Sequence, residues 1–307
     1  MLNRVFVTGG SGFVGSAVIE ELASRGHQIR ALANRKKIES AVETQSVQGS
    51  LFDVDSLNKA MSGCDAVIHL VGIIMERPSK RITFERIHFQ GTKNVVDAAR
   101  RAGIKRYVQM SAIGARSGAV SNYHKTKFAA EEYVRNSGLE WTIFRPSMIH
   151  GPRGEFMQME AKWARRQAPP FLFMPYFGGG IFGQKGAGKI QPVFVNDVAR
   201  AFVDALENRK TIGEVYQLGG SEQMTWPQMH KTIGMQIVGH PRATLPFPVW
   251  AAKFYAAMGI ARLLGFNRDQ IIMSQEENTC DLSKFEKDFG WEPRGFLESL
   301  KSYAARM

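Results

Sequence analysis

The stretch from residue 4 to residue 26, RVFVTGGSGFVGSAVIEELASRG, constrains the fold more than any other part of the chain. A short apolar run leads into Gly9, Gly12 and Gly15, and a helical pattern follows and closes at Gly26. This order predicts a buried strand, a tight turn and a helix. Glycines at that spacing let the backbone approach a pyrophosphate at the helix N-terminus, so we expect a dinucleotide site. A purely structural glycine turn is the alternative.

The alternation of strand and helix continues through residues 1–150. Apolar runs predict further strands, and 3.6-residue periodicity between them predicts helices. The predicted strands are 28–34, 46–53, 65–73, 106–112 and 141–151, and the predicted helices are 94–104 and 122–138. The predicted fold class is therefore α/β, a doubly wound parallel sheet of the Rossmann type. We assign residues 1–150 to this dinucleotide-binding core.

Residues 151–307 follow a different pattern. Segment 169–189 is rich in Pro, Gly and aromatic residues, so we expect a loop or lid with no periodic element. Strand and helix patterns return at about 190–220 and predict the last Rossmann strands. The remainder is expected to form a smaller C-terminal cap subdomain for the substrate.

Several motifs point to one superfamily. The glycine turn is joined by DAVIHLVG, by Tyr123 and Lys127 in YxxxK spacing, by RPSMIHGP and by PVFVNDVARA. Together they resemble the extended short-chain dehydrogenase/reductases, which include the NAD-dependent epimerases and dehydratases. The segments DAVIHLVGI, RYVQMSAIGA and LPFPVW…NRDQI are similar to bacterial relatives of the nucleotide-binding accessory subunit of respiratory complex I.

The resemblance implies a catalytic set. Tyr123 would be the acid/base for hydride transfer at a carbonyl or alcohol carbon, and Lys127 would hold the nicotinamide ribose and lower the pKa of Tyr123. Their spacing puts both on one helix face. The alternative is a half-buried tyrosine beside a surface lysine. Ser111 is the candidate that polarises the substrate oxygen, but another alignment puts Ala112 there. We leave both outcomes open.

The end of the second predicted strand bears on which dinucleotide binds. A carboxylate there would favour NAD(H), but the chain reads Asn34, Arg35, Lys36, Lys37. Positive charge suits a 2′-phosphate, so we predict a preference for NADP(H), with NAD(H) as the alternative.

The resemblance also implies the remaining cofactor contacts. Ser50 and the backbone of Leu51 are expected at the adenine, whereas Asp53 is expected to cap a helix. The full predicted cofactor set is Thr8, Gly9, Gly12, Phe13, Val14, Gly15, Asn34, Arg35, Ser50, Leu51, Leu70, Val71, Gly72, Met110, Tyr123, Lys127 and Pro146.

The net charge of the chain limits the kinds of binding partner that we expect. The chain has 40 Lys+Arg and 28 Asp+Glu, a net charge of +12. We find no nucleic-acid-binding motif and expect no nucleic acid. The basic stretch Arg100–Arg106 is expected to be a surface that meets an anionic membrane or an acidic partner. Residues 245–266 are apolar and are read either as core or as an interface, and no apolar run reaches the length of a membrane span.

Few residues suggest other chemistry. Two cysteines and seven histidines lack the spacing of a disulfide framework or a zinc site, so we expect a reduced, cytoplasmic setting, no metal site and at most a peripheral contact with the membrane. The leading function is an NADP(H)-dependent oxidoreductase or epimerase with a small-molecule substrate, for which an apolar compound is one option. The alternative is a non-catalytic accessory subunit or assembly factor that holds NADPH on a membrane NADH:quinone oxidoreductase-type complex.

Overall fold

The computed structural model describes residues 2–34, 42–180, 188–258, 271–272, 274 and 278–307. The chain divides into two compact units. The sheet unit comprises Met1–Pro146, Val195–Leu218 and Asp281–Glu292. The cap unit comprises Ser147–Phe194, Gly219–Cys280 and Pro293–Met307.

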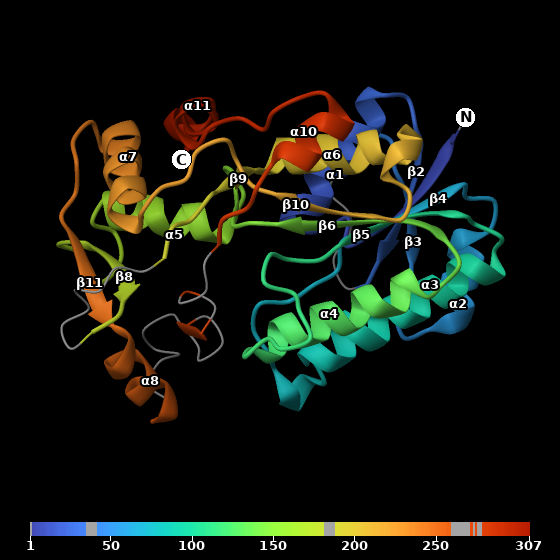
Figure 1. Cartoon of the computed structure of the whole chain (residues 1–307), viewed down its shortest axis with the longest axis horizontal. Helices are drawn as coiled ribbons and strands as arrows, with labels where there is room; N and C mark the ends of the chain where they lie inside the picture. The colour runs from blue at the N-terminus through green and yellow to red at the C-terminus, as the bar shows by residue number, and fades with distance from the viewer. Residues whose placement is uncertain (1, 35–41, 181–187, 259–270, 273, 275–277) are drawn as a thin grey trace. The chain divides into compact units, whose positions relative to one another are not determined.

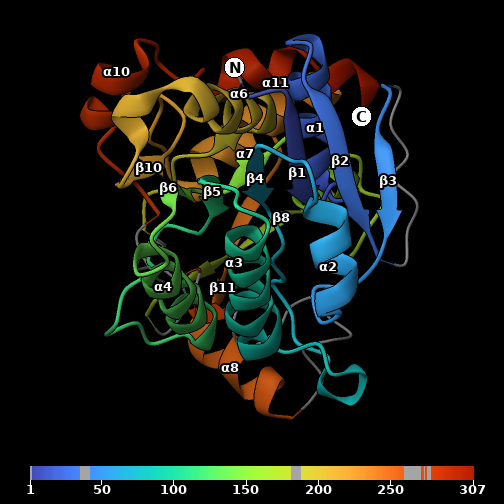
Figure 2. The same ribbon diagram turned by 90° about the vertical axis from the view of Figure 1, so that its right-hand side faces the viewer.

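A seven-stranded parallel sheet forms the centre of the sheet unit, in the order β10-β6-β5-β4-β1-β2-β3. Figure 2 shows β3 and β10 at its opposite edges. The strands are β1 (Arg4–Thr8), β2 (Gln28–Ala33), β3 (Gln45–Gln48), β4 (Ala66–His69), β5 (Arg106–Met110), β6 (Glu140–Pro146) and β10 (Glu214–Leu218). The strand order reverses at β1 and β4, and ligands bind at such a point in doubly wound sheets. The predicted fold class is confirmed.

Helices cover both faces of this sheet (Figure 1). One face carries α1 (Phe13–Ser24), α6 (Val195–Glu207) and α10 (Ser283–Phe289), and the other carries α2 (Val54–Met61), α3 (Gly91–Arg101) and α4 (Asn122–Arg135). A π-helical segment, Glu85–Gln90, leads into α3, and short 3-10 turns span Pro78–Lys80 and Arg209–Thr211. Because both faces are covered, the inner strands read as nearly continuous apolar runs.

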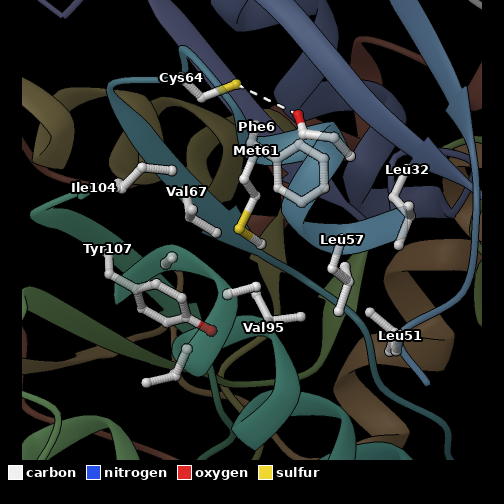
Figure 3. Packing of buried hydrophobic residues seen from close by; sticks show 14 of the residues in the cluster. Phe6, Leu32, Leu51, Leu57, Met61, Cys64, Val67, Val95, Ile104 and Tyr107 are labelled. Atoms are coloured by element: carbon white, nitrogen blue, oxygen red, sulfur yellow. Dashed lines mark hydrogen bonds between the residues drawn. The ribbon is translucent and has the colours of Figure 1, made fainter. Parts of the chain in front are cut away.

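The core on the α2–α3 side is packed with large side chains (Figure 3). Phe6 and Tyr107 come from the sheet, Leu57 and Met61 from α2, and Val95 from α3, and all are fully buried. Burying one such side chain stabilises a fold by about 1.5–3 kcal/mol. This core fixes the strand ends that carry the predicted site.

The cap unit contains two small parallel sheets and four α-helices among the residues described. Its strands are β7 (Ile149–His150) paired with β9 (Val193–Phe194), and β8 (Met174–Gly178) paired with β11 (Thr244–Pro248). Its helices are α5 (Glu155–Ala164), α7 (Trp226–Val238), α8 (Val249–Ala257) and α11 (Phe296–Lys301), with a 3-10 turn at Ala304–Arg306. Of the strands predicted at about 190–220, β10 joins the seven-stranded sheet and β9 pairs with β7 instead.

The prediction that segment 169–189 contains no periodic element is wrong for part of it. Residues Met174–Gly178 form β8, which pairs with β11 some seventy residues later in the chain, Met174 opposite Thr244. The partner supplies the hydrogen bonds, and Pro175 is tolerated because a two-stranded sheet has an open edge on each strand. Residues 181–187 lie outside the described part of the chain.

The prediction that Arg100–Arg106 forms a basic surface is wrong for Arg106. Its side chain is buried where β5 begins, and the guanidinium donates to the Glu140 carbonyl at 2.6 Å, to Thr142 Oγ1 at 2.7 Å and to Thr211 Oγ1 at 2.9 Å. Burial lowers the pKa of Arg106 to about 10. This arginine ties β5 to its neighbours and contributes nothing to a docking surface.

Candidate cofactor and active site

Backbone hydrogen bonds hold the turn between β1 and α1. The Gly12 N–H donates to the Gly9 carbonyl at 3.0 Å, and Gly9 has a φ of 80°, in the left-handed region. A Cβ on Gly15 would lie 2.1 Å from the Gly9 oxygen, so only glycine fits there. Helix α1 begins at Phe13 with no side-chain cap and no acidic residue in its first turn. Its first N–H groups are therefore suited to receive a phosphate.

Beneath this turn, a buried histidine ties the carboxyl ends of β1 and β4 together. Thr8 Oγ1 and His69 Nδ1 lie 2.5 Å apart, and His69 Nε2 lies 3.1 Å from Thr92 Oγ1. Burial, aided by the Lys127 ammonium, lowers the pKa of His69 to about 3, so the ring is neutral. The Leu70 N–H donates to the Thr8 carbonyl at 3.2 Å. The Thr8 side chain thus supports the strand ends beneath the turn.

The residues predicted for the 2′-phosphate lie at the end of β2. Asn34 is exposed, and its carbonyl accepts a hydrogen bond from Gln48 Nε2. No carboxylate occupies Ala33 or Asn34, the last described positions there. Arg35 lies outside the described residues.

The residues predicted for the adenine follow β3. Ser50 is half-buried, and its hydroxyl accepts from the Phe52 N–H at 3.2 Å. Leu51 is buried, and its carbonyl accepts from Asn94 Nδ2 at 2.8 Å. Asp53 accepts from the N–H three residues on, at the first turn of α2. The predicted helix cap at Asp53 is confirmed.

Helix α4 places Tyr123 and Lys127 one turn apart on the same face. The Lys127 side chain is buried, and its Nζ donates to the Met110 carbonyl at 3.2 Å. A Cβ on Gly72 would lie 3.0 Å from that Nζ, so the glycine after β4 leaves room beside the ammonium. Lys127 is therefore buried, whereas the alternative interpretation required a lysine on the surface.

Burial shifts the pKa values of the two residues in opposite directions. It raises the pKa of Tyr123 to about 12, because a phenolate is poorly solvated there, and this is the reverse of the lowering by Lys127 that the resemblance implied. It lowers the pKa of Lys127 to about 8, and the Glu131 carboxylate opposes that change. At neutral pH the phenol keeps its proton and the amine keeps its charge.

A neutral histidine packs beside Tyr123. The π-helical segment carries His88, whose ring meets the Tyr123 ring edge-on at a centroid distance of 5.2 Å, and Phe84 meets Tyr123 in the same way at 5.7 Å. His88 Nδ1 lies 3.0 Å from Thr126 Oγ1, and Nε2 lies 3.1 Å from the Ile73 N–H. A proton on Nδ1 satisfies both, and burial lowers the pKa of His88 to about 2. His88 thus links α4 to the segment after β4.

Ser111 belongs to a buried ion-pair network. Its hydroxyl donates to the Glu131 carboxylate, which is fully buried. Arg145 and Arg135 also bind Glu131, with Nη2–Oε2 distances of 2.6 Å and 2.8 Å. The next residue, Ala112, has no side-chain donor. The hydroxyl expected at the substrate oxygen is therefore engaged by a carboxylate in this structure.

Sequence reasoning missed Glu131 and Arg145. One signal for Glu131 is in the sequence, because Tyr123, Lys127 and Glu131 follow one another at four-residue spacing and form a single stripe on the helix. A carboxylate in a buried stripe needs a cation, and Arg145 is that cation. For His88, the four-residue spacing from Phe84 indicates that both side chains share one helix face, and their rings stack at a centroid distance of 5.3 Å.

The remaining predicted residues lie along the same edge of the sheet. Leu70 contacts the β1 end, and Gly72, Met110 and Lys127 converge as described above. Pro146 ends β6 and its carbonyl accepts from the Ile113 N–H at 3.1 Å. Phe13, Val14 and Val71 are half-buried, and Asn34, Ser50 and Leu51 lie beyond them at the ends of β2 and β3.

Comparisons with known proteins give the family. The NAD(P)H-binding family matches residues 9–162. The chain is 31% identical over 264 residues to NADH dehydrogenase (ubiquinone) 1 alpha subcomplex subunit 9 of Arabidopsis thaliana, covering 82% of this chain and 62% of that one. It is 32% identical over 151 residues to the ceramide reductase of Caulobacter vibrioides, covering 48% and 47%. The matches thus span less than two thirds of either relative.

A solved structure and the family match complete the identification. UDP-glucose 4-epimerase of Thermotoga maritima superposes with a TM-score of 0.76 at 21% identity, over 98% of this chain and 97% of that one, which shows a common fold. In the part of the chain described, no helix has the length and apolar character to cross a membrane. The chain carries an NAD(P)-binding domain and belongs to the NAD(P)H-binding family, and a subunit of NADH dehydrogenase (ubiquinone) is among its relatives.

Proposed function

We propose that this chain is an NADP(H)-dependent oxidoreductase that reduces a carbonyl carbon. The observation that carries the proposal is the Tyr123–Lys127 pair, with Lys127 buried and held by the Met110 carbonyl beside the gap at Gly72. The glycine turn brings the chain close to the uncapped N-terminus of α1, since a Cβ on Gly15 would collide with the Gly9 oxygen, and such a helix N-terminus suits the phosphates of a dinucleotide. When bound, NADPH supplies the hydride that reaches the carbonyl carbon.

Tyr123 would donate its phenolic proton to the carbonyl oxygen as the alcohol forms. A pKa of about 12 keeps that phenol protonated at neutral pH, so its proton is available for donation. Lys127 would hold the nicotinamide ribose and stabilise the charge that develops on Tyr123. The phenol regains its proton from solvent, so the net reaction consumes one proton per hydride.

We propose that Ser111 supports the fold and does not contact the substrate. Its hydroxyl is bound to Glu131, and Ala112 offers no replacement. Loss of one preorganised donor at a substrate oxygen costs about 10²–10³ in rate. We therefore expect turnover slower by that factor than in a site with a side-chain donor, and Ser111→Ala should leave kcat within about threefold. A decrease in the kcat of Ser111→Ala of more than about 10²-fold would show that Ser111 acts on the substrate.

The cofactor preference is a second expectation. NADPH should bind at least about tenfold more tightly than NADH, because no carboxylate follows β2 and Arg35 to Lys37 supply positive charge. Asn34→Asp should reverse the order by repelling the 2′-phosphate. Fluorescence titration of both nucleotides measures this, and equal dissociation constants for the unaltered chain would contradict it.

The Lys127→Met variant tests whether the buried Lys127 ammonium destabilises the fold while serving cofactor binding. Between the folded pKa of about 8 and the unfolded value of 10.5, the unfolded chain binds more protons, so stability of the unaltered protein rises with pH across that window. Below pH 8 the penalty is fully present. The variant should therefore be more stable at pH 7 by roughly 1–3 kcal/mol, yet lose ribose binding. Denaturant unfolding at pH 7 and pH 10 gives both free energies; a destabilised variant at pH 7 would contradict the account.

The proposal is tested by incubating the purified protein with NADPH and a panel of aldehydes and ketones. Loss of reduced-nicotinamide absorbance with at least one carbonyl, matched by alcohol formation, supports it. The panel should include long-chain apolar ketones, because a reductase acting on a lipid is among the relatives.

A second candidate is a subunit that holds NADP(H) without turnover and docks on a membrane respiratory complex. The engagement of Ser111 by Glu131 favours it, and the Arabidopsis relative is named as a subunit of NADH dehydrogenase. It predicts NADPH that binds but stays reduced across the whole panel. It also predicts recovery of NADH:quinone oxidoreductase subunits when the chain is captured from detergent-solubilised membranes.

A further inference from the structure

Helix α8, labelled in Figure 1, exposes large apolar side chains to solvent. Trp250 and Phe254 lie one turn apart and are 60% and 58% exposed, and Met258, one turn further, is 57% exposed. Ala252, on the opposite side of the helix, is fully buried. The arrangement is therefore the reverse of an ordinary surface helix, which buries its large apolar side chains. Monomeric soluble proteins rarely expose such a run without a binding role.

The stretch of sequence that contains this helix carries charge of one sign. Residues 223–268 contain five Lys+Arg and no Asp or Glu, in a chain that has 28 acidic residues. Lys253 is exposed on α8 between Trp250 and Phe254. Leu245, on the neighbouring strand β11, is 49% exposed. The basic side chain of Lys253 and the apolar rings of Trp250 and Phe254 are thus exposed on the same short helix, within a stretch of sequence that has no acidic residue.

We propose that α8 is a peripheral membrane anchor that lies in the interface of an anionic lipid bilayer. Trp250 and Phe254 would enter the boundary between headgroups and acyl chains, and Lys253 would reach out to lipid phosphates. An extended anionic surface complements a segment that has only positive charges, whereas a protein partner would have to present acidic groups all along it. The anchor is independent of the hydride transfer proposed above, so each proposal can be correct when the other is wrong.

The length of α8 decides between lying on a bilayer and crossing it. Nine residues at 1.5 Å each give a helix of roughly 14 Å, about half the hydrocarbon thickness of about 30 Å. Helix α8 also packs through Ala252 on the cap unit, so its outer face alone is available to lipid. The anchor therefore binds to one leaflet.

Co-sedimentation with vesicles tests the anchor. The full chain should bind vesicles of phosphatidylcholine with phosphatidylglycerol and should bind pure phosphatidylcholine at least about tenfold more weakly, with affinity falling as salt rises. Trp250→Ser with Phe254→Ser should lower the affinity at least about 100-fold. Val54→Ser with Leu297→Ser, which removes exposed apolar side chains elsewhere, should leave it unchanged. NADPH titration verifies that each variant is folded.

Two outcomes would overturn the anchor. The first is equal vesicle binding by the Trp250/Phe254 double variant and the unaltered chain. The second is that the unaltered chain binds neither kind of vesicle, forms a dimer in solution, and loses that dimer in the double variant. The exposed face of α8 would then join two copies of the chain. A blue shift of tryptophan fluorescence on anionic vesicles that disappears in Trp250→Phe supports the anchor, and its persistence in that variant counts against it.

Discussion

Replacing Tyr123 with phenylalanine should lower NADPH-dependent carbonyl reduction by about 10²- to 10⁴-fold, the usual contribution of a positioned general acid. The ring keeps its edge-on contacts with His88 and Phe84, so the fold and the NADPH dissociation constant should change little. Only the proton that neutralises the carbonyl oxygen is lost. Single-turnover kinetics with saturating NADPH measures this loss apart from cofactor binding.

Tyr133→Phe is the matched control, because Tyr133 lies on the same helix and its hydroxyl donates to Asp97 Oδ1 at 2.7 Å. It removes a phenol of α4 that has no part in the proposed chemistry, so the rate should stay within about twofold and only a hydrogen bond worth about 1 kcal/mol is lost. If Tyr123→Phe kept more than a tenth of the rate, Tyr123 would not be the proton donor.

Replacing Glu131 with alanine should destabilise the protein by about 3–5 kcal/mol, the second large effect. Glu131 is fully buried and binds Arg145, Arg135 and the Ser111 hydroxyl. Its removal leaves the Arg145 guanidinium, whose side chain is only 19% exposed, without a counter-charge. Denaturant unfolding at neutral pH measures the change.

The neighbouring residue supplies the control. Glu132 also binds Arg135, but its side chain is 48% exposed. Glu132→Ala should therefore cost less than about 1 kcal/mol, as exposed ion pairs do. Equal losses for the two variants would show that burial does not set the strength of the Glu131 network.

The sheet and its glycine turn could be predicted because local signals agree with the tertiary structure. The central strands β1 and β4 are mostly apolar runs, Gly9 takes a left-handed backbone conformation, and Gly15 lies against the Gly9 oxygen. Strand β8 could not be predicted, since Pro175 and the glycines around it signal a loop and only β11 makes the segment a strand. The prediction that Arg106 lies on the surface was wrong for a related reason. A basic residue usually indicates solvent exposure, and the buried acceptors of Arg106 come from distant segments.

The part of the site that lies on a single helix could be predicted from the sequence. Spacing alone puts Tyr123 and Lys127 on one face of α4. Spacing does not reveal that Lys127 is buried beside Gly72, because that contact joins α4 to the end of β4. The engagement of Ser111 by Glu131 joins the residue after β5 to α4, and Arg135 of α4 and Arg145 of β6 hold the carboxylate, so no single stretch of sequence encodes it.

Transfer of an isotope tests the central claim most directly. The protein is incubated with a reactive carbonyl and NADPH that carries deuterium at the transferable position of nicotinamide C4, and the alcohol is analysed by mass spectrometry. The account predicts deuterium on the former carbonyl carbon with the unaltered chain and at least about a 100-fold slower appearance with Tyr123→Phe. Tight NADPH binding without deuterium in any alcohol would contradict it, and would assign the chain to the cofactor-holding subunits.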